Sequence, residues 1–141
     1  MEEMFEYTYF EKIDLRSFSS NRLNTVEEMF CGSKTKSIVF GNNFTLSNAS
    51  ILKAMFDSCQ SLTELDLSMF TTNNATDMSI MFYGCKSLVS LNISNFNTSR
   101  VTNMDSMFYN NKVFNSDISN WDVSNVKDME NMFAHSEFNG D

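Results

Sequence analysis

At 141 residues, of which 42% are apolar, the chain is long enough for one domain with a hydrophobic core. Acidic residues outnumber basic ones by 18 to 10, and the formal charge of -8 argues against nucleic acid and anionic membranes as partners. The longest apolar runs fall far short of the roughly 18 residues that cross a bilayer, so membrane insertion is not expected.

Met-Phe pairs recur along the chain at a nearly constant spacing. They stand at Met4-Phe5, Met29-Phe30, Met55-Phe56, Met81-Phe82, Met107-Phe108 and Met132-Phe133, which are 25, 26, 26, 26 and 25 residues apart. A period in the twenties indicates units that must stack to bury their apolar faces. We therefore expect one domain over 1–141, with repeats starting near 4, 29, 55, 81 and 107 and a partial repeat from 132. Because the chain begins and ends inside a repeat, we expect either a piece of a longer protein or ends that a partner covers.

The first half of a repeat has the pattern of a short strand. Apolar residues follow an L-x-x-L-x-L spacing in the runs Phe10 to Leu15, Leu62 to Leu67 and Leu88 to Ile93. The last two apolar residues of each run flank a polar one, which predicts a strand with a single buried face.

The second half of a repeat has apolar residues six and three positions before the Met of the last five Met-Phe pairs, which together with Met-Phe predicts a helix of about three turns. Helix-capping residues stand eight positions before five of the Met residues, at Asn21, Ser47, Asn73, Ser99 and Ser124. Residues suited to the left-handed conformation that ends a helix follow three positions after the Met, at Gly32, Ser58, Gly84 and Asn110. Eleven positions before the Met stand aromatic residues that we expect to form a ladder in the core: Phe18, Phe44, Phe70, Phe96 and Trp121.

Two repeats depart from this pattern. In the second repeat, Ile38 and Phe40 either occupy the buried strand positions, with an extra residue absorbed near Gly41, or point outward as an apolar patch. The fifth repeat is one residue shorter and has Val113 and Trp121 among its apolar positions. Trp121 fits the aromatic ladder, and the alternative is a platform on which a sugar could stack.

Residues for catalysis or for a cofactor are scarce. His135 is the only histidine, and Cys31, Cys59 and Cys85 have no metal-binding spacing, so neither enzyme activity, nor a metal, nor a cofactor is expected. Cys59 and Cys85 occupy the same place in successive repeats, which suits either a disulfide or two buried free thiols.

The segments LTELDLSMF and FNSDISNWDVSNVKDMENMF resemble BspA-like leucine-rich-repeat surface proteins, and the resemblance covers nearly the whole chain. It implies an α/β leucine-rich-repeat-like solenoid of about five repeats, with short parallel strands on one side and short helices on the other. It also implies a cell-surface or secreted location and a role in adhesion. The sequence contains no export signal that would support this location.

Polar residues on the exposed side of the predicted strands are the candidate binding site. They are Lys12, Asp14, Arg16, Glu64, Asp66, Ser68, Ser90, Asn92, Ser94, Asp117 and Ser119, with Asn115 beside them. A large polar face suits many weak contacts with a protein or a glycan. We therefore expect a non-enzymatic binding or adhesion module. The alternatives are a structural spacer in a longer array and an intracellular scaffold or inhibitor, and end-to-end self-association is a further expectation.

Overall fold

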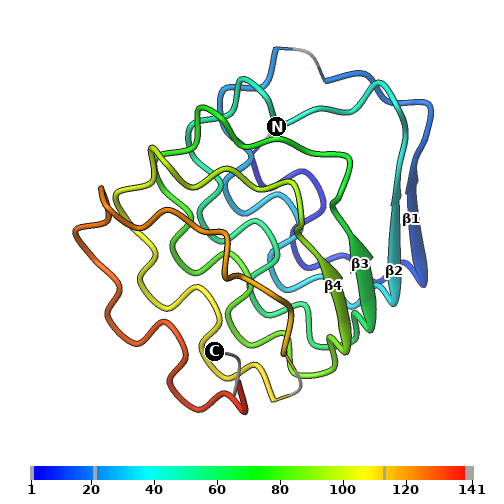
Figure 1. Ribbon diagram of the computed structural model, residues 1–141. Coiled ribbons are helices and arrows are strands. Elements are labelled where there is room, and N and C mark those ends of the chain that lie inside the picture. Colours follow the sequence, from blue (N-terminus) through cyan, green and yellow to red (C-terminus); the bar gives the residue numbers. More distant parts are fainter. Residues whose placement is uncertain (1, 21, 113, 139–141) are drawn as a thin grey trace.

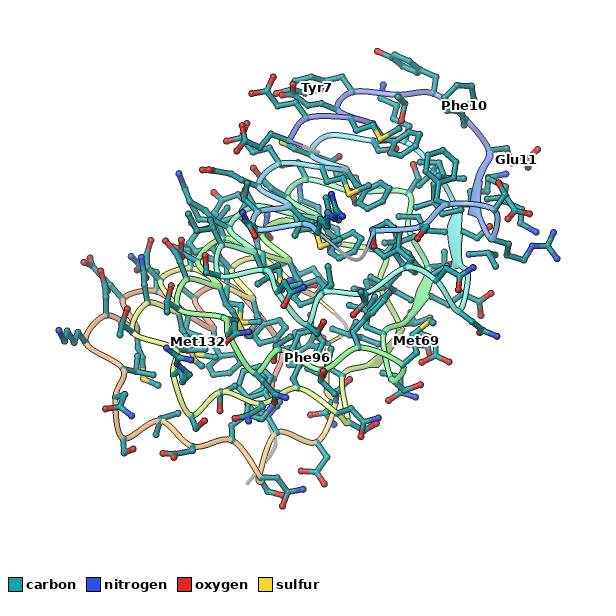
Figure 2. All side chains as sticks on the ribbon, turned by 90° about the horizontal axis from the view of Figure 1, so that it is seen from above. Tyr7, Phe10, Glu11, Met69, Phe96 and Met132 are labelled. Atoms are coloured by element: carbon teal, nitrogen blue, oxygen red, sulfur yellow. The ribbon has the colours of Figure 1, made fainter. Side chains whose placement is uncertain are left out.

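The computed structural model describes residues 2–20, 22–112 and 114–138; Met1, Asn21, Val113 and 139–141 lie outside these ranges. The chain winds coil upon coil, with the first coil at one end of the stack and the last at the other (Figure 1). Side chains fill the interior along the whole stack, from the coil that carries Tyr7 to the coil that carries Met132 (Figure 2). The described residues include four short strands: β1 (Lys12–Leu15), β2 (Ser37–Phe40), β3 (Glu64–Asp66) and β4 (Ser90–Asn92).

The strands pair in parallel, because equivalent segments of successive coils run in the same direction. β1 pairs with β2, where Ile13 lies opposite Ile38, and β3 pairs with β4, where Leu65 lies opposite Leu91. These four side chains point into the core and are at most 8% exposed. Their immediate neighbours on β1, β3 and β4 are exposed, so the alternation predicted from the sequence is confirmed.

The part of the chain that the structure describes contains no helix, so the expected α/β leucine-rich-repeat solenoid with a helix in each repeat is wrong. The hydrogen bonds before each Met-Phe pair give the reason. Every second amide donates to the next coil, as Val26 does to the carbonyl of Ile51 at 3.1 Å and Phe30 to that of Met55 at 2.9 Å. The amides between them donate within their own coil, as Met29 does to Val26 at 3.2 Å. An α-helix would instead bond each amide to the carbonyl four residues back.

The same segment joins neighbouring coils through parallel bridges. These bridges run in order through Thr25, Ile51, Asp77, Asn103 and Asp128. The coils are thus held together along two lines, one made by the strands and one by these bridges. Tight turns connected to a neighbouring coil replace the predicted helix.

Left-handed residues make these turns possible. Three positions after each Met, the predicted left-handed conformation is confirmed, with φ of 64° at Gly32, 56° at Ser58 and 65° at Gly84. A second set, directly before the Met, was not predicted and includes Ala54 at 53° and Ser106 at 54°. Two left-handed positions so close together are incompatible with a continuous right-handed helix.

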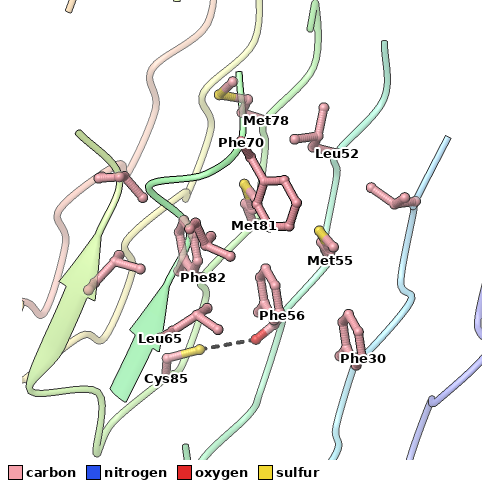
Figure 3. Close-up of a cluster of buried hydrophobic side chains, with 14 of the residues drawn as sticks. Phe30, Leu52, Met55, Phe56, Leu65, Phe70, Met78, Met81, Phe82 and Cys85 are labelled. Carbon is pink, nitrogen blue, oxygen red and sulfur yellow. Dashed lines mark hydrogen bonds between the residues drawn. The ribbon is translucent and has the colours of Figure 1, made fainter. Parts of the chain in front are cut away.

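A column of stacked phenylalanine rings runs through the core (Figure 3). Ring centroids are 5.3 Å apart between Phe30 and Phe56, 5.6 Å between Phe56 and Phe82, and 5.5 Å between Phe82 and Phe108. The planes of these rings differ by at most 5°. The column is therefore made by the phenylalanine that follows each Met.

The aromatic ladder predicted eleven positions before the Met is not a stacked column. Phe44 and Phe70 are buried there, but their rings meet edge to face at 5.8 Å. Trp121 is half-buried and packs against the core, with its ring 6.1 Å from that of Phe108. Its place favours the core interpretation over a sugar platform.

The irregular second repeat turns its large side chains inward. Ile38 is 7% exposed, and the half-buried Phe40 ring lies 5.0 Å from the rings of both Phe44 and Phe70. Gly41 follows, and a Cβ atom there would lie 2.4 Å from the carbonyl oxygen of Arg16. The buried arrangement is confirmed, and glycine is required where the two coils approach.

Candidate functional site

The outward side of the strands carries most of the polar residues chosen from the sequence. Lys12 and Asp14 stand on β1, and exposed side chains continue along β3 and β4. Strand register places Glu64 opposite Ser90 and Asp66 opposite Asn92. We call this side of the molecule the strand face.

Four predicted site residues have a second role in turns of the backbone. The side-chain oxygens of Asp14, Asp66, Asn92 and Asp117 accept a hydrogen bond from the backbone amide two residues later, at 3.1, 3.0, 3.3 and 2.9 Å. Those amides belong to Arg16, Ser68, Ser94 and Ser119. Such turns form wherever an Asp or Asn can bond its own backbone. The presence of these polar residues on the strand face is therefore partly explained by the turns that they form.

These hydrogen bonds also keep the carboxyl groups ionised. The Arg16 side chain, 3.0 Å from both carboxylate oxygens of Asp14, lowers the pKa of Asp14 to about 2. Hydrogen bonds from Ser68 lower the pKa of Asp66, and those from Ser119 lower the pKa of Asp117. The strand face thus presents fixed negative charge at neutral pH.

A hollow of about 360 Å³ lies on the strand face. It is lined by Ile38, Glu64, Leu65, Asp66, Ser90 and Asn92. Its lining is mainly polar, with two carboxyl groups, a hydroxyl and an amide, and Ile38 and Leu65 make up the apolar part. β1 and β2 form one strand pair and β3 and β4 another, and the hollow spans the boundary between them.

The structure brings together only some of the predicted residues. A smaller hollow of about 240 Å³ adjoins the first and is lined by Leu91, Asn92, Ile93, Ser94, Ser116 and Asp117. Lys12 and Asp14 instead line a separate depression beside Phe10 and Phe18. The apolar residues that line these hollows, such as Leu65 and Leu91, were not predicted from the sequence, because period-two alternation assigns them wholly to the core.

Other groups with reactive chemistry are buried or isolated. Cys31, Cys59 and Cys85 are free thiols, which confirms the unbonded alternative for Cys59 and Cys85. The Cys85 thiol donates to the carbonyl of Phe56 at 3.0 Å (Figure 3), and burial raises its pKa to about 12. Among the residues the structure describes, no group of His, Cys, Asp and Glu side chains is placed to hold a metal ion. Nor does any helix in this part of the chain have the length and apolarity to span a bilayer.

One protein family matches the whole chain. Its description is "Mycoplasma protein of unknown function, DUF285", and it matches residues 1–64 and 50–141. No curated protein and no solved structure matches the chain. These findings do not support the leucine-rich repeat or the adhesion role expected from the resemblance.

Proposed function

Because the chain belongs to the DUF285 family, whose description names no activity, we propose its function from its own residues. It is a non-enzymatic binding module that holds a protein ligand on the strand face. The observation that carries this proposal is the hollow lined by Glu64, Asp66, Ser90 and Asn92. An ionised carboxyl group and an amide beside the apolar residues Ile38 and Leu65 suit a lysine or arginine side chain, whose stem is apolar and whose end is charged.

The electrostatics of the molecule favour a basic ligand. The net charge of -8 attracts positively charged partners from a distance, and such attraction raises association rates. Near the hollow, Asp66 is held in its charged form by the hydrogen bonds from Ser68. A basic segment docked there would gain its specificity from the hollow and its rate of encounter from the overall charge.

The experiment compares two matched double variants. Glu64→Gln with Asp66→Asn removes the charge of the hollow while the Asn side-chain oxygen can still accept the amide of Ser68. Asp128→Asn with Glu130→Gln removes the same charge elsewhere, at a turn of the same kind, where Asp128 accepts the amide of Glu130 at 3.1 Å.

Peptides selected from a random library against the wild-type chain should be rich in Lys and Arg. Their affinity, measured by biolayer interferometry, should fall about tenfold or more in the hollow variant, or roughly 1.4 kcal/mol, and much less in the control. Added salt should weaken binding to the wild type more than to the hollow variant.

The second candidate is a structural spacer, and the turns formed by Asp14, Asp66, Asn92 and Asp117 favour it. If no peptide is enriched, or if both double variants bind as the wild type does, the strand face has only this structural role.

A further inference from the structure

A second groove lies away from the strand face. It has a volume of about 620 Å³ and is lined by Tyr7, Tyr9, Gly32, Lys34, Ser58, Gln60 and Ser61. It crosses the first three coils at the corner that follows the phenylalanine column. Figure 2 shows Tyr7 at the N-terminal end of the stack, separated by Phe10 from Glu11 and β1. We call it the tyrosine groove.

Tyr7 and Tyr9 are unusually exposed for large aromatic residues, at 63% and 77%. The equivalent positions of the next coil hold Gly32 and Lys34. Tyrosine contributes a large apolar ring and a polar hydroxyl at a low cost in conformational entropy, which is why it is common in binding sites. Two exposed rings at one corner therefore offer a surface on which a ligand could pack.

The neighbouring coil holds both rings in place from one side. A Cβ atom on Gly32 would lie 2.4 Å from two atoms of the Tyr7 ring, so this ring rests directly on the glycine backbone. The ammonium group of Lys34 lies 4.9 Å from the centroid of the Tyr9 ring, a distance at which the cation is attracted to the ring. Each ring thus has one supported face and ample surface left for a ligand.

Polar groups complete the lining of the tyrosine groove. Gln60 supplies an amide, and Ser58 and Ser61 supply hydroxyls. Of the described residues that line the groove, only Lys34 is charged. Sugar rings match this combination, because their C–H groups pack on the electron-rich face of an aromatic ring while their hydroxyls bond amides and hydroxyls.

We propose that the tyrosine groove binds a neutral oligosaccharide, with a pyranose ring stacked on Tyr7 or Tyr9 and its hydroxyls bonded by Gln60, Ser58 and Ser61. A neutral sugar is favoured over an acidic one because the chain carries a net charge of -8, which repels polyanions. This site is independent of the strand face and shares no residue with the hollow there.

The test applies the fluorescently labelled chain to an array of neutral and acidic oligosaccharides, followed by calorimetric titration with the best neutral binder. The wild type should bind neutral members of the array. Tyr7→Ala with Tyr9→Ala should lose about tenfold or more in affinity, because the stacking surface is gone. Tyr7→Phe with Tyr9→Phe keeps the rings and should retain most of the binding.

Two further variants show whether sugar binding takes place at the tyrosine groove or at the strand face. Gly32→Ala should weaken sugar binding by displacing the Tyr7 ring, while Glu64→Gln with Asp66→Asn should leave it unchanged. Thermal melts show which variants are folded, and since both tyrosines are exposed the alanine variant should melt near the wild type. The proposal is overturned if no neutral sugar binds, if acidic sugars are preferred, or if the folded alanine variant binds as tightly as the wild type.

Discussion

Asp and Asn side chains stabilise the turns of this chain. The sequence contains no proline, and turns such as those at Asp66 and Asp122 are closed by a side-chain oxygen that accepts the amide two residues later, at 3.0 and 2.9 Å. Where the acceptor is a carboxylate, the turn depends on ionisation, because a charged acceptor forms the stronger hydrogen bond.

This dependence predicts how stability changes with pH. The pKa values of Asp66, Asp117 and Asp122 are lowered by hydrogen bonds from the serine two residues later. A lowered pKa in the folded state adds stability that is present above the unfolded pKa of about 4 and is lost as pH falls through the folded pKa. The free energy of unfolding of the wild type should therefore decrease as the pH falls below about 4.

Replacing these three residues by Asn should flatten that decrease, since the amide oxygen accepts the same hydrogen bond at every pH. Urea titrations at pH 5 and pH 2.5 would measure it, with Glu64→Gln as the control for loss of charge alone. Burial raises the pKa of Asp57, which acts in the opposite direction but equally in both proteins. A triple variant as acid-sensitive as the wild type would contradict this role of the turns.

At the scale of the element, the segment before each Met-Phe pair is the main departure from expectation. Its inward residues in the third coil, Ala49, Leu52 and Met55, are spaced by threes and are all buried. A helical stripe mixes spacings of three and four, whereas a series of tight turns can repeat every three. The strict spacing of three residues between these apolar positions is the feature of the sequence that argues against a helix.

Substitutions at Ser106 can show whether this segment forms turns or a helix, because the two structures predict opposite orders of stability for Gly and Ala. It has a φ of 54°, and in that conformation an alanine costs about 1 to 2 kcal/mol that glycine does not. In a helix alanine would be better than glycine by about 1 kcal/mol. Both substitutions lose the Ser106 hydroxyl, which donates to Asp105 at 3.0 Å, so that loss cancels in the comparison. We expect Ser106→Gly to unfold at a higher urea concentration than Ser106→Ala. The reverse order would contradict the turns and support a helix in this segment.

At the scale of the whole molecule, the coils depend on one another. Strands, bridges and the phenylalanine column all join one coil to the next, and no coil among the described residues buries its apolar side chains by itself. In such a stack, stability comes from interactions between nearest neighbours. A residue inside the stack therefore stabilises the fold through contacts with two neighbouring coils, whereas a residue in a terminal coil has contacts with fewer.

The phenylalanine column allows this dependence to be measured. Phe82 is fully buried between Phe56 and Phe108, so Phe82→Ala should cost about 3 to 5 kcal/mol. Phe5 is only half-buried and lies in the first coil, so Phe5→Ala should cost less than about half as much. Phe82→Leu, which keeps most of the apolar volume, should fall between them. Equal losses of unfolding free energy at Phe5 and Phe82 would show that the column does not transmit stability through the stack.

The sequence by itself determined the repeat length, the inward and outward residues of β1, β3 and β4, and the left-handed positions at Gly32 and Gly84. These features follow from local rules, because burial alternates along a strand and glycine tolerates positive φ. The tertiary structure alone decided that the amides of Val26 and Phe30 bond to a neighbouring coil, which aromatic residues stack, and that Tyr7 rests on Gly32. Such contacts join residues about 25 positions apart, and the spacing of side chains within one repeat carries no information about which partner an amide or a ring finds in the next.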